Sequence, residues 1–484
     1  MIPPLAFFIT YVDTGRNFLG CCSLNFLCLY LSLSFSLFLS LCVCLQGNIT
    51  NMAIFNDITM ATARRPYTFI LALLLTILFF LYTSRLEKFS SAPPRIYTPT
   101  ASEEMQLDSE YISGRFGFDG TWNYTRDYRN LFLSQKQCDV AFPGLFEEVE
   151  RPVRLRRNKK ISKKELDDTP QLNGFIRAMI FDQQLYIIDT YGKIYSRGIA
   201  TLQALHRAML TSPEPLPNIE FTMNVDDRME GHPQWLYARQ AHQSETWLMP
   251  EYGFWSWPET KIGSYGEMQM KALLTEASWP WDRKIDKLLW RGATMNLEVR
   301  KKFIEVTQGK EWADVKSLDW HDEGSMKNDL KSMDEHCQYK FLAHTEGNSY
   351  SARLKYLRNC RSVIIAHRLE WMEFFHPLMK KDGPEQNYIE VDREFEGLQE
   401  TMVDLLARKD QLEEIAERSV RVFRERYLTP AAETCYWRRL IQGWKEVMGF
   451  EVEFFNVTAL GEKKWRGVPV ESFLLERRLE WDPY

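Results

Sequence analysis

The sequence predicts an α/β protein whose sheets are mostly parallel. Strand-like and helix-like segments alternate along the 484 residues, a pattern typical of parallel strands covered by helices. The clearest unit spans 335–377 and consists of an alternating strand (QYKFLAH), a glycine-containing turn (TEGNS), a helical pattern (YSARLKYLRNC) and a buried strand (SVIIA). A second strand, KLLWRG, ends at Arg291 and also leads into a helical pattern. These two strand–loop–helix units are the main evidence for the fold class.

Length and composition narrow the class of protein further. The chain is long enough for two ordinary domains and an anchor. Its 45% hydrophobic and 26% charged residues indicate a globular protein. A net charge of −5 gives no reason to expect a nucleic-acid partner. The eight histidines form no HxxxH or HExxH pattern, so we predict no metal site.

The N-terminal region contains two apolar runs. The second, residues 67–83, follows Arg64 and Arg65 and has about the minimum length that crosses a bilayer. Arginines on that side keep an N-terminus cytosolic, which predicts an uncleaved signal anchor. The first run, residues 18–45, lies in an N-terminal tail of residues 1–66 and duplicates this signal. Our hypothesis is that the residues before Met52 or Met60 are absent from the mature protein, which peptides from residues 1–50 would overturn.

Several elements are predicted between the anchor and the C-terminus. Residues 84–135 are polar and contain proline, as expected of a stem. LYIIDT followed by GKIY predicts a hairpin, and IATLQALHRAML predicts a helix. An alternating strand over 219–225 ends at Asp226 and Asp227, at the sheet edge where ligands bind in α/β proteins. Asn296 is expected to cap the helix after KLLWRG, and residues 394–450 are predicted to be largely helical.

The turn TEGNS predicts an anion site. A turn that leads into a helix leaves backbone N–H groups pointing one way, at the positive end of the helix dipole. Phosphate is a usual ligand at such a place. Ser349 or Ser351 is expected to cap this helix, and Arg353 one turn later suits a diphosphate because its planar fork binds two oxygens. The alternative is an ordinary capped helix with a solvated arginine.

The cysteines and two asparagine triplets indicate an oxidising compartment. Five of the nine cysteines lie in the first apolar run, and Cys138, Cys337, Cys360 and Cys435 remain. Four cysteines permit two disulfides in three connectivities, and the alternative is four reduced buried thiols. Asn123-Tyr-Thr and Asn456-Val-Thr are glycosylation acceptors if this part is lumenal.

Four segments resemble glycosyltransferase family 90, which holds the Rumi-type protein O-glucosyltransferases and the capsule-associated β-xylosyltransferases. In chain order they are FTMNVDDR, WPWDRKIDKLLWRG, HCQYKFL…EGNSYSARLKYL…SVII…EWMEFFHP, and CYW at 435–437. The resemblance covers about 138–450. It implies the GT-B arrangement of two Rossmann-like domains facing a cleft, with an acceptor domain at 136–275, a nucleotide-sugar domain at 276–455 and a tail at 456–484.

The resemblance also implies an activity and a location. We expect an inverting transfer of glucose or xylose from UDP-glucose or UDP-xylose to a hydroxyl of a protein or glycan acceptor. No metal or other cofactor is expected. The catalytic part would lie in the lumen of the endoplasmic reticulum or Golgi, attached as a single-pass type II membrane protein.

Site residues follow from the same resemblance. Asp227 matches the catalytic base of the NV-x-D motif, and Tyr265 falls where the family has an aromatic residue at the donor, although packing explains Tyr265 equally well. Arg291 matches a residue that contacts the nucleotide sugar. The donor-binding loop of the family matches Asn348, Ser349, Tyr350, Ser351, Ala352 and Arg353. The spacing of Cys337 and Cys360 matches a family disulfide, which leaves Cys138 and Cys435 as the second pair.

Two other functions stay open, as does the acceptor. The acids of Val225-Asp226-Asp227 would suit a metal-dependent transferase, and a chain that had lost turnover would be a lumenal glycan-binding or scaffold protein. In Rumi-like proteins a disulfide-closed loop helps to bind a cysteine-rich acceptor domain. The matching region here, near 196–203, contains no cysteine.

Overall fold

The computed structural model describes residues 118–227, 232–457 and 461–479. They belong to one compact unit, residues 100–484, whereas the unit formed by residues 1–99 lies outside the described residues. The predicted anchor at 67–83 and most of the predicted stem are therefore outside as well. Among the described residues, no helix has the length and apolar composition needed to cross a membrane.

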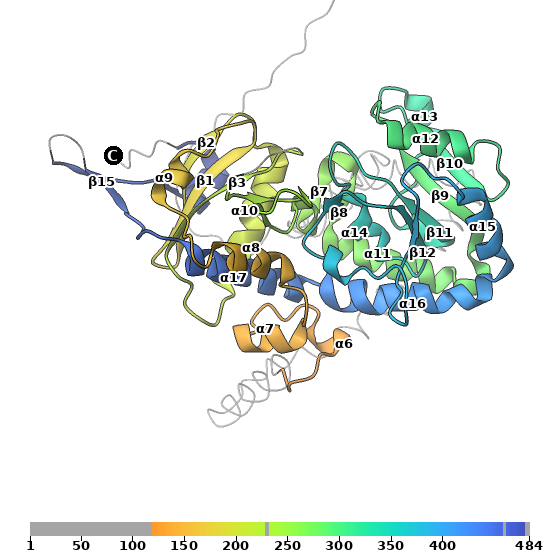
Figure 1. Cartoon of the computed structure of the whole chain (residues 1–484), viewed down its shortest axis with the longest axis horizontal. Helices are drawn as coiled ribbons and strands as arrows, with labels where there is room; N and C mark the ends of the chain where they lie inside the picture. Colours follow the sequence, from red (N-terminus) through yellow and green to blue (C-terminus); the bar gives the residue numbers. More distant parts are fainter. Residues whose placement is uncertain (1–117, 228–231, 458–460, 480–484) are drawn as a thin grey trace, which may run out of the picture. The chain divides into compact units, whose positions relative to one another are not determined.

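The second sheet in the chain is parallel throughout, as predicted. Its strand order is β10-β9-β11-β12-β14 (Figure 1). The two best predicted strands, KLLWRG and QYKFLAH, are neighbours in it. The strands are β9 (Ile285–Gly292), β10 (Ala313–Ser317), β11 (Tyr339–His344), β12 (Val363–His367) and β14 (Ile389–Val391).

The first sheet is mixed, and here the prediction of mostly parallel strands is wrong. Its order is β17-β2-β1-β3-β4-β6; the first three neighbouring pairs are antiparallel, and the pairs β3–β4 and β4–β6 are parallel. The strands are β1 (Phe175–Phe181), β2 (Gln184–Tyr191), β3 (Ile219–Asn224), β4 (Trp235–Leu236), β6 (Trp247–Leu248) and β17 (Val468–Pro469).

The predicted hairpin of LYIIDT with GKIY is also wrong. β2 pairs with the preceding strand β1, through a two-residue loop in which Asp182 and Gln183 have positive φ values of 47° and 64°. GKIY instead leads into helix α10 (Tyr195–Leu210). The Asp-Gln loop lacks the glycine or asparagine that usually marks a hairpin turn. Gly192, after β2, is such a residue, and so the turn was predicted there.

The helices largely follow their predictions, including the helical C-terminal region. Asn296 does not cap α12, because it has a positive φ of 60° and Leu297 takes the capping position without a side-chain bond. The remaining helices are α6 (Tyr124–Asp127), α7 (Gln135–Ala141), α8 (Glu147–Arg156), α9 (Lys163–Asp167), α11 (Tyr265–Ser278), α12 (Glu298–Thr307), α13 (Glu323–Asn328), α14 (Arg353–Leu357), α15 (Leu398–Ala407), α16 (Glu413–Val422), α17 (Pro430–Val447) and α18 (Val470–Glu476).

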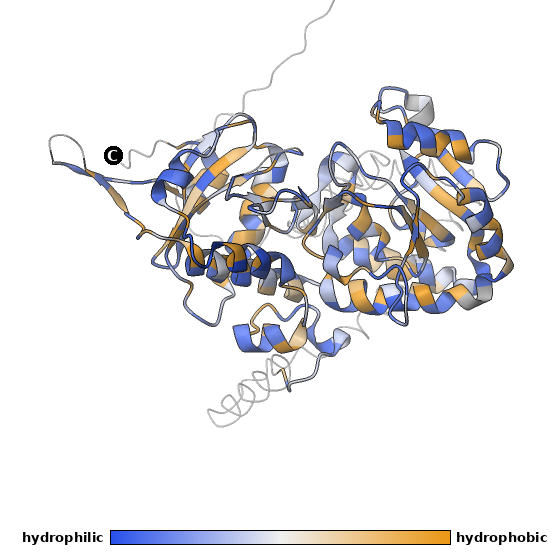
Figure 2. Cartoon of the chain, viewed as in Figure 1, coloured by the Kyte–Doolittle hydropathy of each residue, from blue (hydrophilic) through white to orange (hydrophobic). Residues whose placement is uncertain are grey.

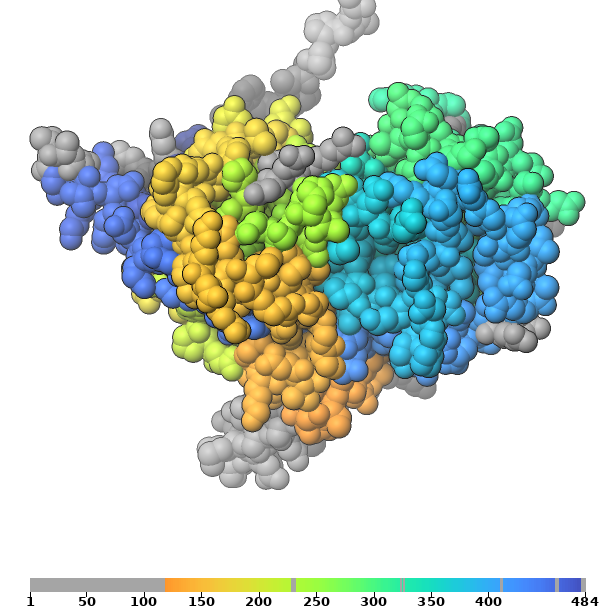
Figure 3. All heavy atoms as spheres, in the orientation of Figure 1, coloured from red at the N-terminus to blue at the C-terminus, as the bar shows by residue number. Residues whose placement is uncertain are grey.

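Segments distant in sequence connect the surroundings of the two sheets. Helix α17 packs against α8 and α10 beside the first sheet, and β17 near the C-terminus extends that sheet. Strand β5 (Arg239–Gln240) pairs with β13 (Trp371–Met372), and these light green and cyan segments meet in Figure 3. Segments that lie on opposite sides of the predicted domain boundaries at 275 and 455 therefore contact each other.

Buried aromatic side chains of α17 form much of the core beside the first sheet. Trp444 packs edge-on against Trp235 and Trp247, at ring-centroid distances of 5.9 and 5.1 Å, and its Nε1 donates to the Glu220 carbonyl at 2.9 Å. Figure 2 shows hydrophobic residues along the strands of both sheets. The burial of these side chains is the dominant favourable term for docking α17 on the sheet.

Both predicted disulfides are present. One joins Cys337 to Cys360, and the other joins Cys138 on α7 to Cys435 on α17. The first connects the segment before β11 to the end of the turn after α14. It therefore closes the βαβ unit on which the sequence analysis centred.

Removal of the Cys337–Cys360 bridge should lower the free energy of unfolding by about 3 kcal/mol, because the bridge closes a short loop in the unfolded chain. The pair is 23 residues apart. The test is urea unfolding of the double alanine variant under oxidising conditions. Removal of the other bridge, which spans 297 residues, should cost more on the same chain-entropy argument. A smaller loss of unfolding free energy on removal of the Cys138–Cys435 bridge would contradict the chain-entropy argument.

Candidate functional site

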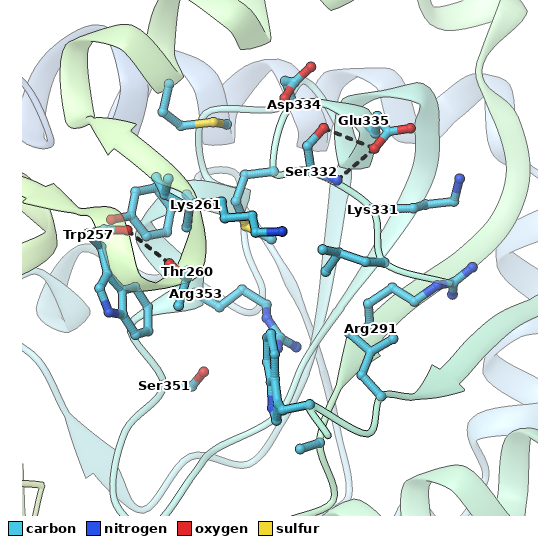
Figure 4. Close-up of a pocket in the computed structure, with 18 of the residues that line it drawn as sticks. Trp257, Thr260, Lys261, Arg291, Lys331, Ser332, Asp334, Glu335, Ser351 and Arg353 are labelled. Atoms are coloured by element: carbon cyan, nitrogen blue, oxygen red, sulfur yellow. Dashed lines mark hydrogen bonds between the residues drawn. The ribbon is translucent and has the colours of Figure 1, made fainter. Parts of the chain in front are cut away.

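A pocket of about 610 Å³ lies at the carboxyl ends of β9 and β11 (Figure 4). This volume is in the range of sites that enclose a small molecule. One wall comes from the segment before and within α11, including Trp257 and Lys261. The other comes from the loops after β9 and β10, the segment before β11, and the start of α14. The predicted residues Arg291, Ser351 and Arg353 are among those that line it.

Arg353 lies at the centre of this pocket and forms no ion pair with any residue that the structure describes. Its guanidinium points into the cavity and lies over the Trp290 ring, 5.4 Å from the centroid. A Cβ at residue 292 would lie 2.7 Å from Nη2, so Gly292 gives the guanidinium its space. Nη1 is buried and has no hydrogen-bond partner among the described residues. Burial, with a smaller contribution from repulsion by Arg300, lowers the pKa of Arg353 to about 9.

Arg300 adds a second buried positive charge that the sequence analysis missed. It also lies over Trp290, and its Nε and Nη1 donate to the carbonyls of Glu346 and Ala293 at 2.8 and 2.7 Å. Burial lowers the pKa of Arg300 to about 10. Its neighbours Lys301 and Lys302 are exposed and pair with acids of their own helix. The residue types alone do not distinguish Arg300 from Lys301 and Lys302. They differ in which face of α12 they occupy, and only Arg300 lies on the face that packs inward.

The pocket as a whole favours an anion. Lys261 and Lys331 also line it, and neither they nor Arg353 and Arg300 form an ion pair within the described part of the chain. The acids of the lining, Asp334 and Glu335, are fewer than its cations. Figure 4 shows the Lys261 amine directed into the cavity. An isolated buried charge is costly, so a ligand that supplies negative charge at this position would bind with a large electrostatic gain.

The charge of Arg291 is largely balanced by acceptors within the protein. Its Nη2 donates to Asp314 Oδ1 at 2.6 Å, Nη1 donates to the Trp290 carbonyl at 2.9 Å, and Nε donates to the Asp329 carbonyl at 2.7 Å. In Figure 4 the guanidinium turns away from Arg353. Arg291 therefore braces the sheet edge beside the pocket, and its contact with a ligand stays a prediction.

The loop at 348–353 exposes backbone donors, but the helix after it is short. Helix α14 contains five residues, and its capping residue Ala352 makes no side-chain bond, so the predicted caps Ser349 and Ser351 are wrong. Ser349, Tyr350 and Ala352 are buried, Asn348 is half-buried, and Ser351 faces the pocket. The backbone N–H groups of 349–353 donate to no acceptor in the described residues. An anion here would meet free N–H groups and arginines, with little help from a one-turn helix dipole.

Tyr265 does not line the pocket. It is the first residue of α11 and is buried, with its hydroxyl accepting a hydrogen bond from Asn359 Nδ2 at 3.2 Å. Its ring packs against Phe254 and Tyr356. These contacts are those of a packing residue, and a role at the donor stays a prediction.

The two acids after β3 have different environments. Asp226 is held at both oxygens: Oδ2 accepts from Asn173 Nδ2 and Oδ1 accepts from the Asp227 backbone N–H, both at 2.7 Å. Asp227 Oδ1 accepts from Arg197 Nη1 at 2.6 Å, and its side chain is 34% exposed. Its Oδ2 accepts no hydrogen bond from any described residue. Of the two acids, Asp227 is thus the one that has an oxygen without a hydrogen bond from any described residue, on a half-exposed side chain.

Aromatic contacts connect Asp227 to the pocket, although Asp227 is not part of the lining. Arg197 lies over the Tyr252 ring at 5.0 Å, and Tyr252 packs edge-on against Trp257, a pocket residue, at 5.2 Å. Burial works to lower the pKa of Arg197, but Tyr252 and Asp227 outweigh it and the pKa is raised. Arg197 therefore stays charged and holds Asp227 beside this aromatic group.

Both predicted glycosylation asparagines are exposed. Asn123 is the capping residue of α6, where its Oδ1 accepts from the Arg126 backbone N–H. Asn456 lies on β15 (Phe455–Val457), which pairs with β16 (Lys463–Trp465). Exposure makes both accessible, and their modification stays a prediction.

The fold and site define an α/β protein with a cationic pocket at the carboxyl edge of a parallel sheet. The sequence model of Glycosyl transferase family 90 matches residues 134–459. The chain therefore belongs to glycosyl transferase family 90, a family of glycosyltransferases, which confirms the predicted resemblance.

Three curated relatives illustrate the similarity. Protein O-glucosyltransferase 1 of Homo sapiens is 27% identical over 262 residues, which cover 49% of this chain and 64% of the human protein. The Rattus norvegicus protein of the same name is 26% identical over 322 residues, covering 60% of this chain and 80% of the relative. O-glucosyltransferase rumi of Drosophila melanogaster is 24% identical over 377 residues, covering 66% and 89%. The match thus spans less than two thirds of the human protein.

Proposed function

We propose that this chain is an inverting glycosyltransferase that moves glucose or xylose from a UDP-sugar to a hydroxyl of a protein or glycan acceptor. The observation that carries the proposal is the Arg353 guanidinium in a pocket of suitable size, because its buried Nη1 has no hydrogen-bond partner among the described residues. A diphosphate supplies the missing negative charge and matches the planar fork of an arginine. The names of the relatives, protein O-glucosyltransferase and rumi, support the same reaction class.

The donor half of the reaction follows from the charges in the pocket. As the bond between the sugar C1 and the diphosphate oxygen breaks, its electron pair stays on that oxygen. Arg353, Arg300 and the Ser351 loop line the pocket in which this negative charge would develop, and we assign its stabilisation to the two guanidinium groups. The sugar passes through an oxocarbenium-like state, as in glycoside hydrolysis.

The acceptor half uses Asp227. Its Oδ2 takes the proton of the acceptor hydroxyl while the hydroxyl oxygen attacks C1 on the face opposite the leaving diphosphate, which inverts the anomeric centre. Arg197 holds Oδ1 and so orients the other oxygen towards the acceptor. Leu172, Tyr191 and Tyr195 are exposed at the same edge of the first sheet, where an acceptor would approach.

We place the reaction in the lumen of the endoplasmic reticulum or Golgi, with residues 67–83 as a type II anchor. Two disulfides and the exposed asparagines of two glycosylation triplets, Asn123 and Asn456, support an oxidising compartment. A GT-B arrangement agrees with two sheets whose edges carry the base and the anion pocket.

The deciding experiment is a UDP-sugar hydrolysis panel on the purified protein, with and without a chelator. We expect turnover of UDP-glucose or UDP-xylose that survives chelation. Loss of activity on chelation would favour the metal-dependent alternative, although Asp226 and Asp227 are engaged by Asn173 and Arg197. If the protein neither binds UDP nor hydrolyses a UDP-sugar, the result would favour a non-catalytic lumenal protein.

UDP affinity should depend on pH through Arg353. The charged form binds the diphosphate, so affinity is full below about pH 8 and falls as the pH rises through about 9. Stability responds in the opposite direction. The pKa of this arginine is higher in the unfolded chain than in the folded protein, so the unfolded chain keeps the proton over this range and the free energy of unfolding of the ligand-free protein rises with pH. Calorimetric UDP titrations between pH 7 and about pH 10 test this. Arg353→Met, the control, should lack the Arg353-dependent loss, and an equal loss in both proteins would contradict the assignment.

A further inference from the structure

A buried ion pair lies directly behind the pocket. Lys355 of α14 follows Arg353 by two residues, and its ammonium contacts the carboxylate of Glu251, with both side chains almost completely buried. Lys355 Nζ also donates to the Ala352 carbonyl at 2.9 Å. Burial raises the pKa of Glu251 and lowers that of Lys355. A pair in this position is costly to desolvate, and apolar residues of similar volume would often stabilise a fold as well. Stability alone therefore does not account for it.

The turn that carries Glu251 is seated closely on α14. Glu251 Oε2 accepts from the Gly253 N–H at 2.9 Å, and the Tyr356 hydroxyl donates to the Gly253 carbonyl at 3.1 Å. A Cβ at residue 253 would lie 2.5 Å from both Lys355 Nζ and the Tyr356 hydroxyl. The turn and the helix are thus fixed to each other through side chains and backbone, with no space for a shift.

The same turn also carries the contact with the candidate base. Tyr252 supports Arg197, and Arg197 binds Asp227. On the other side, the carbonyl that Lys355 holds belongs to Ala352, which lies between the pocket residues Ser351 and Arg353. A continuous set of contacts therefore runs from Asp227 through the turn to the loop that would bind the diphosphate.

We propose that Glu251 and Lys355 are positioning residues that hold the Arg353 loop in register with Asp227. The inference rests on the proposed function and adds to it two residues that touch neither substrate. In-line displacement needs the base, the acceptor oxygen and C1 in one geometry, and a misplacement of about 1 Å costs on the order of 100-fold in rate. The pair sets this geometry because it joins the turn that supports Arg197 and Asp227 to the helix that carries Arg353.

The test uses the full chain with Glu251→Gln and Lys355→Met combined. Glutamine keeps the acceptor for the Gly253 N–H, and methionine keeps the length of the lysine stem without a buried charge. We expect the melting temperature to stay close to that of wild type, the Kd for UDP to change less than about threefold, and kcat for UDP-glucose hydrolysis to fall on the order of 100-fold. The single variant Lys355→Met removes the buried ammonium and its contact with the Ala352 carbonyl, and it leaves a carboxyl that can take up a proton because burial raises the pKa of Glu251. It should show the same split with a smaller loss in kcat.

A matched control is available at Glu148 and Arg239. This pair is also buried, with Arg239 Nε and Nη2 donating to the two Glu148 oxygens at 2.7 and 2.8 Å, and it contacts neither Asp227 nor the pocket. The Glu148→Gln, Arg239→Met variant should keep kcat. Wild-type kcat in both Lys355 variants, or an equal loss of kcat in the control, would overturn the inference. If the wild-type protein neither binds UDP nor hydrolyses UDP-glucose, the proposed function fails, and this outcome is distinct from failure of the positioning role.

Discussion

Replacing Arg353 by methionine should weaken UDP binding by roughly 100-fold, about 3 kcal/mol, without loss of stability. The affinity falls because the diphosphate loses its central charged donor. Stability is retained because this guanidinium is buried without a hydrogen bond at Nη1, so the ligand-free fold loses no partnered contact there. Methionine fills similar space over Trp290. Isothermal calorimetry with UDP and thermal unfolding of the ligand-free protein measure the two effects.

Arg438 is the matched control for this prediction. It is equally an interior arginine, but its donors are satisfied by the carbonyls of Ala208 and Leu133 at 2.9 Å and by the Thr211 hydroxyl at 2.8 Å. Arg438→Met should lower the melting temperature, because the carbonyls and the hydroxyl that accept from Arg438 would be buried without a donor. It should leave UDP affinity unchanged. If Arg353→Met showed that same pattern, Arg353 would be a structural residue and the diphosphate site would lie elsewhere.

Asp227→Asn should reduce sugar transfer by about 10²–10⁴-fold and leave UDP affinity nearly unchanged. The amide keeps the shape of the side chain but does not accept the acceptor's proton. UDP binding persists because Asp227 does not line the pocket. Rates of UDP-glucose hydrolysis and UDP titrations on the same preparation separate the two effects.

Asp226→Asn decides which of the adjacent acids is the base. Asp226 already accepts hydrogen bonds at both oxygens, so its replacement should cost much less activity than that of Asp227. The opposite order would move the base to Asp226. Equal loss of UDP affinity in Asp227→Asn and Arg353→Met would contradict the division of roles between base and leaving-group site.

Local patterns predicted the parts of the fold in which neighbours in sequence are also neighbours in space. The strands β9, β11 and β12 were found because short apolar runs bounded by turns leave few alternatives. The hairpin β1–β2 was missed because its loop uses Asp182 and Gln183, whose positive φ values no residue type signalled. The mixed order of the first sheet depends on pairing between distant strands, which periodicity does not encode.

The candidate site divides in the same way. Residue types and family motifs singled out Asp227 and Arg353, and the structure places Arg353 in the pocket. Arg300 was missed because its spacing does not differ from that of Lys301 and Lys302. The hydrogen bonds of Arg291 to Asp314 and Asp329 could not be predicted, because these acceptors are remote from it in sequence.

By itself, the sequence determined the family, the α/β class, the parallel second sheet and the residues able to do the chemistry, because these depend on composition, periodicity and motif order along the chain. The tertiary structure decided which cations and which acid oxygen lack a partner among the described residues, and how Glu251 meets Lys355. The physical reason is that desolvation and charge pairing depend on atoms within a few ångströms in space, and packing alone brings such atoms together.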